Sequence, residues 1–295
     1  MDITSFVLGY KKGKATGGGG GGGGSMEKGT YLLQLPTKPT FLVQNTVFKY
    51  RGECYLMCKG GESSSTSTKH RIIYKIGDED LTFIVRNNNL TTDFYLINTT
   101  FIEYNGLMYI FGDRDIFITF DGSELVEHSD KLGGVRLKGR MNGAVYDGYI
   151  YIVDDYSYSG TKYLYRFDGE TITQVCSVNW TQSSSFLFVW QDNLYAKGAN
   201  DVLYCFNNTS NVFEAVEPSQ TLPINNRGEL VGNEWWYVTE GTFCTYNMET
   251  GENKSVAKVP FSSGDYPMTY EYNGMKRCYA PVNVTNTHLT ILEVE

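Results

Sequence analysis

The stretch Phe101 to Asp113, FIEYNGLMYIFGD, decides the fold, because echoes of it recur through most of the chain. It predicts two short strands joined by a tight turn at Asn105-Gly106. A type I′ hairpin needs a positive φ at both central residues, which Asn and Gly adopt at the least cost. The residues that follow, IFITFDGSELVEHS, predict a second strand pair that turns at Asp121-Gly122. Together the two pairs form a four-stranded antiparallel unit.

This unit repeats along the chain at intervals of about 41 to 54 residues. The outer strand pairs align on aromatic residues that precede a turn, at Phe120, Phe167, Phe206 and Tyr246. A period near 40 to 50 residues with four strands per unit is typical of a β-propeller. The predicted turns of the inner strand pairs, one for each of six blades, are Arg51-Gly52, Asn105-Gly106, Asp147-Gly148, Asp192-Asn193, Gly232-Asn233 and Asn273-Gly274.

The pattern resembles the Kelch-type propellers, in which a blade has an apolar strand, an Asn/Asp-Gly turn, an I-Y-V-F-G-G-like strand and a strand with an aromatic residue before a turn. The match covers about residues 40–295. It departs from the family in two respects, because the double glycine survives only at Gly60-Gly61 and in part at Gly112, and the terminal tryptophan of the fourth strand is missing. The resemblance implies an all-β, six-bladed Kelch-like propeller over residues 26–295.

The two ends of the predicted propeller complement each other. The last unit is one strand short where the chain stops at HLTILEVE, and TYLLQL at residues 30–35 is a strand without a partner. We expect this N-terminal strand to complete the last blade and close the ring, which also keeps the sheet edges short and protected.

Composition supports an all-β chain and limits its partners. Tyr 23 and Phe 16 are high among 295 residues, and aromatic residues suit pleated sheets. The net charge is −8, and no basic stripe is present, so a nucleic-acid surface is not expected. We expect the six cysteines to be reduced core thiols, since their spacing fits no zinc site. Neither a signal peptide nor a membrane-spanning segment is expected.

Residues 1–16 differ from everything that follows. Ile3, Phe6, Val7 and Tyr10 have the spacing of one apolar stripe on a short helix, with Lys11, Lys12 and Lys14 near its end. Such a helix is too short to be stable alone, so it would have to dock on another surface; the alternative is a frayed terminus. Eight glycines and Ser25 follow, and residues 17–25 are therefore expected to be a flexible linker.

The sequence shows no convergent catalytic constellation, and we expect neither a cofactor nor a metal ion. His70, His128 and His288 fall in three different blades. The candidate ligand contacts are charged and aromatic residues in loops after the second strand of a blade or between blades. Carboxylates beside aromatic rings suit a sugar contact, and a calcium contact is an alternative at the carboxylates. The candidates are Asp113, Arg114, Asp115, Asp154, Asp155, Tyr156, Tyr158 and Trp180.

The opening MDITSFVLGYKKGKA and the poly-glycine run resemble the leaders of virion structural proteins of phages and prophages. This resemblance implies a non-enzymatic virion protein, made in a bacterial cytoplasm, that attaches to other virion proteins through residues 1–16. Its propeller would display loops for recognition of a host surface glycan or protein. The alternatives are an intracellular Kelch-like scaffold for protein interactions and, third, a propeller-type lyase or glycosidase.

Overall fold

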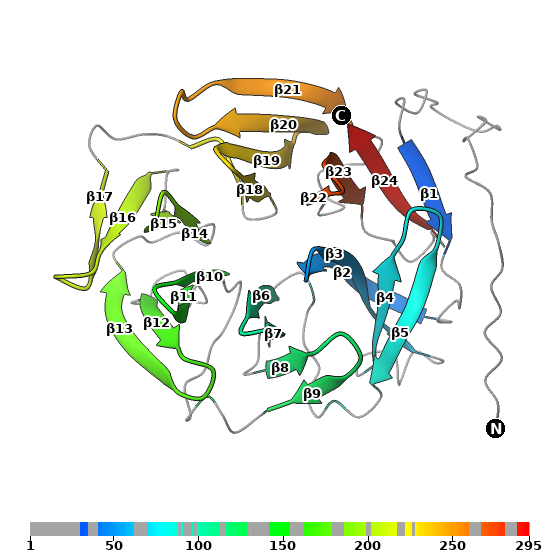
Figure 1. The fold of residues 1–295 in the computed structure, drawn as a ribbon, viewed down its shortest axis with the longest axis horizontal. Coiled ribbons are helices and arrows are strands. Elements are labelled where there is room, and N and C mark those ends of the chain that lie inside the picture. The colour runs from blue at the N-terminus through cyan, green and yellow to red at the C-terminus, as the bar shows by residue number, and fades with distance from the viewer. Residues whose placement is uncertain are drawn as a thin grey trace.

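Six four-stranded sheets surround a central axis in the computed structural model, so the chain forms an all-β, six-bladed β-propeller (Figure 1). Every strand pairs antiparallel with its neighbours in the sheet, and in all blades but the last the first strand in chain order lies nearest the axis. The structure describes residues 30–34, 41–61, 70–87, 90, 96, 99–112, 116–128, 132, 142–153, 162–178, 186–198, 202–216, 222–225, 228–259, 267–280 and 288–294.

The strands of each blade follow one another in the chain, apart from the last blade. Blades 1 and 2 are β2 (Phe41–Tyr50), β3 (Glu53–Gly61), β4 (Arg71–Ile76) and β5 (Leu81–Asn87), then β6 (Thr100–Tyr104), β7 (Leu107–Gly112), β8 (Ile116–Phe120) and β9 (Leu125–Glu127). Blades 3 and 4 are β10 (Asn142–Tyr146), β11 (Tyr149–Val153), β12 (Lys162–Phe167) and β13 (Ile172–Val178), then β14 (Phe186–Trp190), β15 (Asn193–Lys197), β16 (Leu203–Asn207) and β17 (Val212–Ala215). Blade 5 is β18 (Glu229–Val231), β19 (Glu234–Thr239), β20 (Thr242–Asn247) and β21 (Asn253–Lys258).

Blade 6 combines strands from both ends of the chain. Its order is β22 (Met268–Tyr272), β23 (Met275–Ala280), β24 (His288–Val294) and then β1 (Thr30–Gln34). In the register of β1 and β24, Thr30 lies opposite Leu292 and Gln34 lies opposite His288. That β1 holds the ring closed stays a prediction.

The inner turns have the backbone conformation that the hairpin argument requires. Asn105 has φ 49° and Gly106 has φ 76°, and the pairs at residues 51–52, 147–148 and 273–274 repeat this pattern. In blade 5 only Gly232 is positive, with φ 60°, as expected for the first central residue of a type II′ turn. In blade 4 the predicted turn was one residue too late, because Gln191 and Asp192 carry the positive φ values and Asn193 already begins β15.

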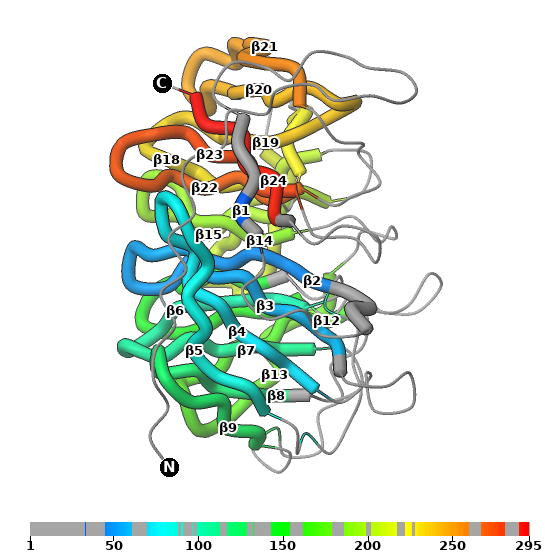
Figure 2. The backbone as a smooth tube through the Cα atoms, turned by 90° about the vertical axis from the view of Figure 1, so that its right-hand side faces the viewer, coloured from blue at the N-terminus to red at the C-terminus, as the bar shows by residue number. Residues whose placement is uncertain are grey.

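The strand order gives the propeller two different ends. We call the end with the turns after the first and third strands of each blade the turn face; the β2–β3 and β22–β23 turns project there, on the left of Figure 2. We call the opposite end the loop face, since it carries the connections after the second and fourth strands. The register of β1 and β24 directs Thr30 toward the turn face and Gln34 toward the loop face.

The hydrophobic core is divided into six clusters, and each lies between two neighbouring blades. Adjacent residues of a strand point to opposite faces of the sheet, so two neighbouring tryptophans of blade 5 lie in different clusters. Trp235 packs against Phe186 and Phe188 of blade 4, whereas Trp236 packs with Cys278 and Leu292 of blade 6. Both indoles are buried, so both faces of blade 5 are closed by a neighbouring blade.

The cysteines agree with the sequence prediction in part, since four of the six lie in the core. All six cysteines are free thiols, and Cys54, Cys58, Cys244 and Cys278 are buried. Burial raises the pKa of the Cys54 thiol to about 11. These thiols therefore act as small apolar side chains. Among the described residues, no helix is long and apolar enough to cross a membrane.

Candidate functional site

The residues predicted to contact a ligand or a particle lie outside the described residues. These are the anchor residues Ile3, Phe6, Val7 and Tyr10, and the loop residues Asp113, Arg114, Asp115, Asp154, Asp155, Tyr156, Tyr158 and Trp180. The strands that flank these loops are described. The connections between β7 and β8, between β11 and β12, and between β13 and β14 all leave from the loop face of adjacent blades 2, 3 and 4.

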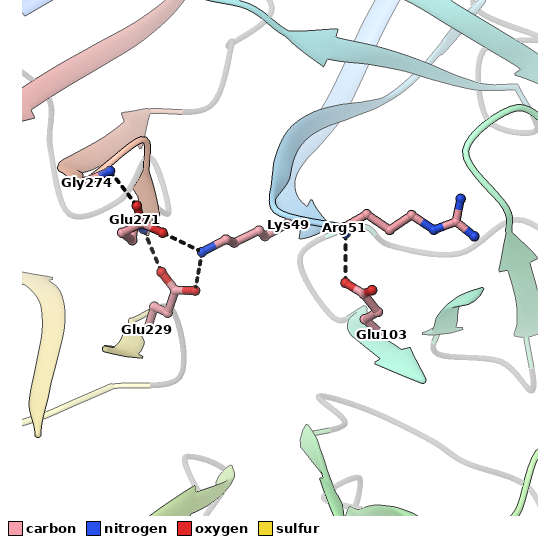
Figure 3. A network of polar contacts seen from close by, with 6 residues as sticks. All are labelled: Lys49, Arg51, Glu103, Glu229, Glu271 and Gly274. Atoms are coloured by element: carbon pink, nitrogen blue, oxygen red, sulfur yellow. Dashed lines mark hydrogen bonds and ion pairs between the residues drawn. The ribbon is translucent and has the colours of Figure 1, made fainter. Parts of the chain in front are cut away.

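A charged cluster on the inner strands is the most concentrated polar feature that the described residues offer (Figure 3). The ammonium of Lys49 donates to Glu229 Oε1 at 3.1 Å and to Glu271 Oε2 at 3.3 Å. The backbone N–H of Glu271 donates to Glu229 Oε2 at 2.6 Å, and the N–H of Gly274 donates to Glu271 Oε1 at 2.6 Å. The cluster joins blades 1, 5 and 6, and each of its four carboxylate oxygens accepts a hydrogen bond.

The hairpin pattern explains how these side chains meet. Lys49, Glu103 and Glu271 each stand two residues before the first residue of an inner turn, and each contacts the preceding blade around the ring. Glu229 stands one residue earlier relative to its own turn. Because side chains alternate along a strand, it points toward the following blade and meets Glu271. The four residues thus share one level of the turn face.

The local environment shifts the pKa values of the two carboxylates of the cluster in opposite directions. Burial raises the pKa of Glu229, and the nearby N–H of Glu271 and the ammonium of Lys49 only partly oppose this effect. The hydrogen bond from the Gly274 N–H lowers the pKa of Glu271. Burial alone would lower the pKa of Lys49, but the two carboxylates outweigh it and the pKa is raised. The Lys49 ammonium lies between two partly buried carboxylates, and the Glu229 side chain (22% exposed) is less exposed than that of Glu271 (32%).

Neighbouring contacts favour a structural role for this cluster. The residue just before an inner turn is aromatic in several blades and donates to the following blade. Tyr50 Oη donates to the Gly106 carbonyl at 2.6 Å, Tyr104 Oη donates to the Gly148 carbonyl at 2.7 Å, and Trp190 Nε1 donates to Asn233 Oδ1 at 3.2 Å. In blade 5 this position is Val231, which has no side-chain donor. There Glu229 makes the contact between blades instead.

The carboxylates of Glu229 and Glu271 have a limited capacity for acid/base chemistry. Two carboxylates with pKa values shifted in opposite directions could serve as a proton donor and a proton acceptor. However, their oxygens already accept bonds from Lys49 and from two backbone N–H groups, so a substrate would have to displace these donors. Within the described ranges no group of three or more His, Cys, Asp or Glu side chains could hold a metal ion.

Sequence reasoning missed Lys49, Glu229 and Glu271. A signal was available, because superposing the six units on their turns gives Lys49, Glu103 and Glu271 at one position and Val145, Val189 and Leu230 at the same position of the other blades. Charged residues at an otherwise apolar inner position indicate a polar contact there. Which of these side chains pair across three blades depends on how the blades pack in the ring. The linear sequence does not indicate that pairing.

No protein-family model matches the sequence, and no curated protein matches it either. The Kelch and phage resemblances therefore remain proposals.

Proposed function

We propose that the chain is a non-enzymatic virion protein of a phage or prophage whose propeller recognises a host-surface glycan or protein. In this proposal residues 1–16 attach to another virion protein, residues 17–25 are a flexible tether, and β1 closes a Kelch-like ring. The observation that supports it is that Thr30 and the strand ends that flank the candidate loops lie at opposite ends of the propeller. Thr30, where the tether joins the propeller, is directed to the turn face, whereas the candidate ligand loops leave from the loop face.

Two physical features support this assignment. The six apolar seams make the propeller a rigid body, so its loops keep a fixed relative position while the tether absorbs motion. Many copies on one particle would also raise weak single-site binding to firm attachment by effective concentration. Neither feature depends on a catalytic group.

The proposal is tested by separating the two ends of the chain. Deletion of residues 1–16 should abolish co-purification with phage particles while a glycan array or host-cell binding assay with the soluble chain is unchanged. Y156A/Y158A should show the reverse. D147N/E170Q on the turn face of blade 3 serves as the matched control and should affect neither assay. Particle association that survives the deletion, or host binding that survives Y156A/Y158A together with D113A/D115A, contradicts the proposal.

The charged cluster is the one specific observation that bears on the lyase or glycosidase alternative. An acid/base role predicts that E229Q abolishes turnover of a substrate, whereas the contact between blades described above predicts only a change in stability. Capture of a defined cytosolic partner through the loop face, without any host-surface binding, would favour the scaffold alternative.

A further inference from the structure

Two of the three Asn-Gly pairs in the chain stand in inner turns with the same four residues, EYNG, one in blade 2 and one in blade 6. Asn105 has φ 49° and Gly106 has φ 76°. Asn273 has φ 51° and Gly274 has φ 79°, and all four residues are exposed. Asparagine before glycine is chemically labile, because the glycine nitrogen has no neighbouring side chain to shield it from the asparagine amide. Local sequence and local conformation therefore predict equal lability in the two turns.

In blade 6 the glutamate of the turn holds the glycine nitrogen. The Gly274 N–H donates to Glu271 Oε1 at 2.6 Å (Figure 3), and this bond lowers the pKa of the Glu271 carboxyl. The carboxylate is therefore ionised at neutral pH, and the N–H must give up a charge-assisted hydrogen bond before its nitrogen can react. The negative charge also opposes removal of the proton from that nitrogen. Both effects protect Asn273.

In blade 2 the neighbouring blade draws the equivalent glutamate away from its turn. Glu103 Oε2 accepts the backbone N–H of Arg51 at 2.8 Å, as Figure 3 shows. The Gly106 N–H donates to no group within the part of the chain that the structure describes. The Gly106 carbonyl accepts from Arg51 Nη2 at 2.8 Å. A guanidinium is thus held on the residue whose nitrogen would react, and its positive charge favours loss of the proton from that nitrogen.

We propose that Asn105 is a site of spontaneous deamidation and that Glu271 protects Asn273 in the identical tetrapeptide. The Gly106 nitrogen loses its proton and bonds to the side-chain carbonyl carbon of Asn105. The bond from that carbon to the amide nitrogen breaks, and the amide group leaves with the proton as ammonia, so that a succinimide remains. Water then opens the succinimide at either carbonyl and gives aspartate or isoaspartate.

The modification acts on the contact between blades 1 and 2. Tyr50 Oη donates to the Gly106 carbonyl at 2.6 Å, beside the bond from Arg51. Isoaspartate lengthens the backbone of this turn by one carbon, and either product adds a negative charge two residues from Glu103. Deamidation at Asn105 therefore weakens a contact between blades, whereas the turn of blade 6 stays intact. The inference goes beyond the virion role and does not depend on it.

The test is peptide mass spectrometry of the full-length protein during incubation at neutral pH, with the two asparagines followed separately. Asn105 should deamidate at least about tenfold faster than Asn273, the factor that one hydrogen bond to a charged group carries. In urea both contacts are lost, and the two rates should become similar because the same tetrapeptide surrounds both asparagines. This comparison of the folded and the unfolded chain needs no variant.

Two variants assign the difference to the named contacts. E271A should raise the rate at Asn273 and leave the rate at Asn105 unchanged. E271Q removes only the charge and should raise the rate at Asn273 less, which keeps the test valid if E271A fails to fold. R51Q keeps the backbone N–H that holds Glu103 and removes the guanidinium, so it should slow Asn105 alone.

Three outcomes would overturn the proposal. Equal rates at the two asparagines of the folded protein would show that the contact with Glu271 gives no protection. A faster rate at Asn273, lost in E271Q, would show that the Glu271 carboxylate acts as a general base. A ratio of rates that is the same in urea as in the folded protein would assign the difference to the residues flanking each turn.

Discussion

At the scale of single residues, the contacts between blades depend on the side chain that precedes each inner turn. The Tyr104 hydroxyl spans from blade 2 to the Gly148 carbonyl in the turn of blade 3. A Tyr in this place packs its ring against Tyr109 and satisfies a backbone acceptor of its neighbour at the same time. One atom therefore couples two sheets that share no strand.

Tyr104→Phe removes this hydrogen bond and keeps the ring. We expect a loss of about 1 kcal/mol in the free energy of unfolding, the usual net value for one intramolecular hydrogen bond, measured by urea denaturation. Tyr163→Phe is the control. Tyr163 packs against Tyr165, and its hydroxyl forms no hydrogen bond within the described residues, so the change should stay within about 0.5 kcal/mol. Equal losses in the two variants would contradict the assignment.

The two carboxylates around Lys49 predict opposite pH dependences. The raised pKa of Glu229 stabilises the fold fully below the ordinary value of 4.5, and this contribution is lost as the pH rises through the raised value. The lowered pKa of Glu271 stabilises the fold above 4.5, and this contribution is lost as the pH falls through the lowered value.

The check is the unfolding free energy of the wild type minus that of each variant, between about pH 3 and about pH 7. For E229Q this difference should fall as the pH rises above about 4.5. For E271Q it should fall as the pH drops below about 4.5. Slopes of the same sign in the two variants would show that the pKa values of Glu229 and Glu271 are shifted in the same direction, which contradicts the prediction.

At the scale of elements, β1 is a strand of only five residues whose loss is expected to have a large effect on stability. It supplies the outer strand of blade 6, and Leu33 is 3% exposed in the cluster between blades 1 and 6. If β1 closes the propeller as predicted, loss of the strand would expose β24 as an edge and open an apolar seam.

Deletion of residues 26–36 should therefore lower the melting temperature sharply, and an unchanged melting temperature would refute closure by β1. A milder variant avoids the risk that the deletion fails to fold. Leu33→Ala should cost about 2 to 5 kcal/mol, as is usual for a buried leucine. Val212→Ala on the outer strand of blade 4 is the control, since Val212 is 40% exposed and should cost little.

At the scale of the whole molecule, the core is a closed circuit of six seams with no single centre. Each blade buries both faces only while both neighbours are in place, so removal of one blade exposes two seams. A ring of this kind is expected to unfold as one unit, because partly opened states lose apolar burial without the full gain of chain entropy.

The prediction is that probes of different seams report the same transition. Tryptophan fluorescence reports on all four tryptophans, among them Trp235 and Trp236 on the two sides of blade 5. Labelling mapped to single thiols follows Cys58, which is fully buried between blades 1 and 6. Their urea midpoints should coincide with that of far-UV circular dichroism. Labelling of Cys58 at a lower urea concentration than the fluorescence change would reveal that the seam beside β1 opens first.

Much of this architecture is local and could be predicted from the sequence. Asn105-Gly106 and its repeats dictate hairpins because few residue pairs tolerate positive φ, and the period then gives six blades. The turn in blade 4 was misplaced by one residue, since Gln191 gives no such signal and Asp192-Asn193 does. The free thiols and the burial of both tryptophans also follow from strand context.

Only the tertiary structure decided which side chains meet across the ring. Lys49 and Glu271 are separated by 222 residues and Lys49 and Glu229 by 180, yet they share one ion-pair cluster because ring closure brings blade 1 beside blade 6. The joining of the acidic β4–β5 turn to β23 through Arg277 has the same origin. The sequence by itself determined the blade, because a hairpin is fixed by φ preferences and alternation within a few residues. The cluster arises only when six blades pack in a circle, since the packing of distant surfaces sets those distances.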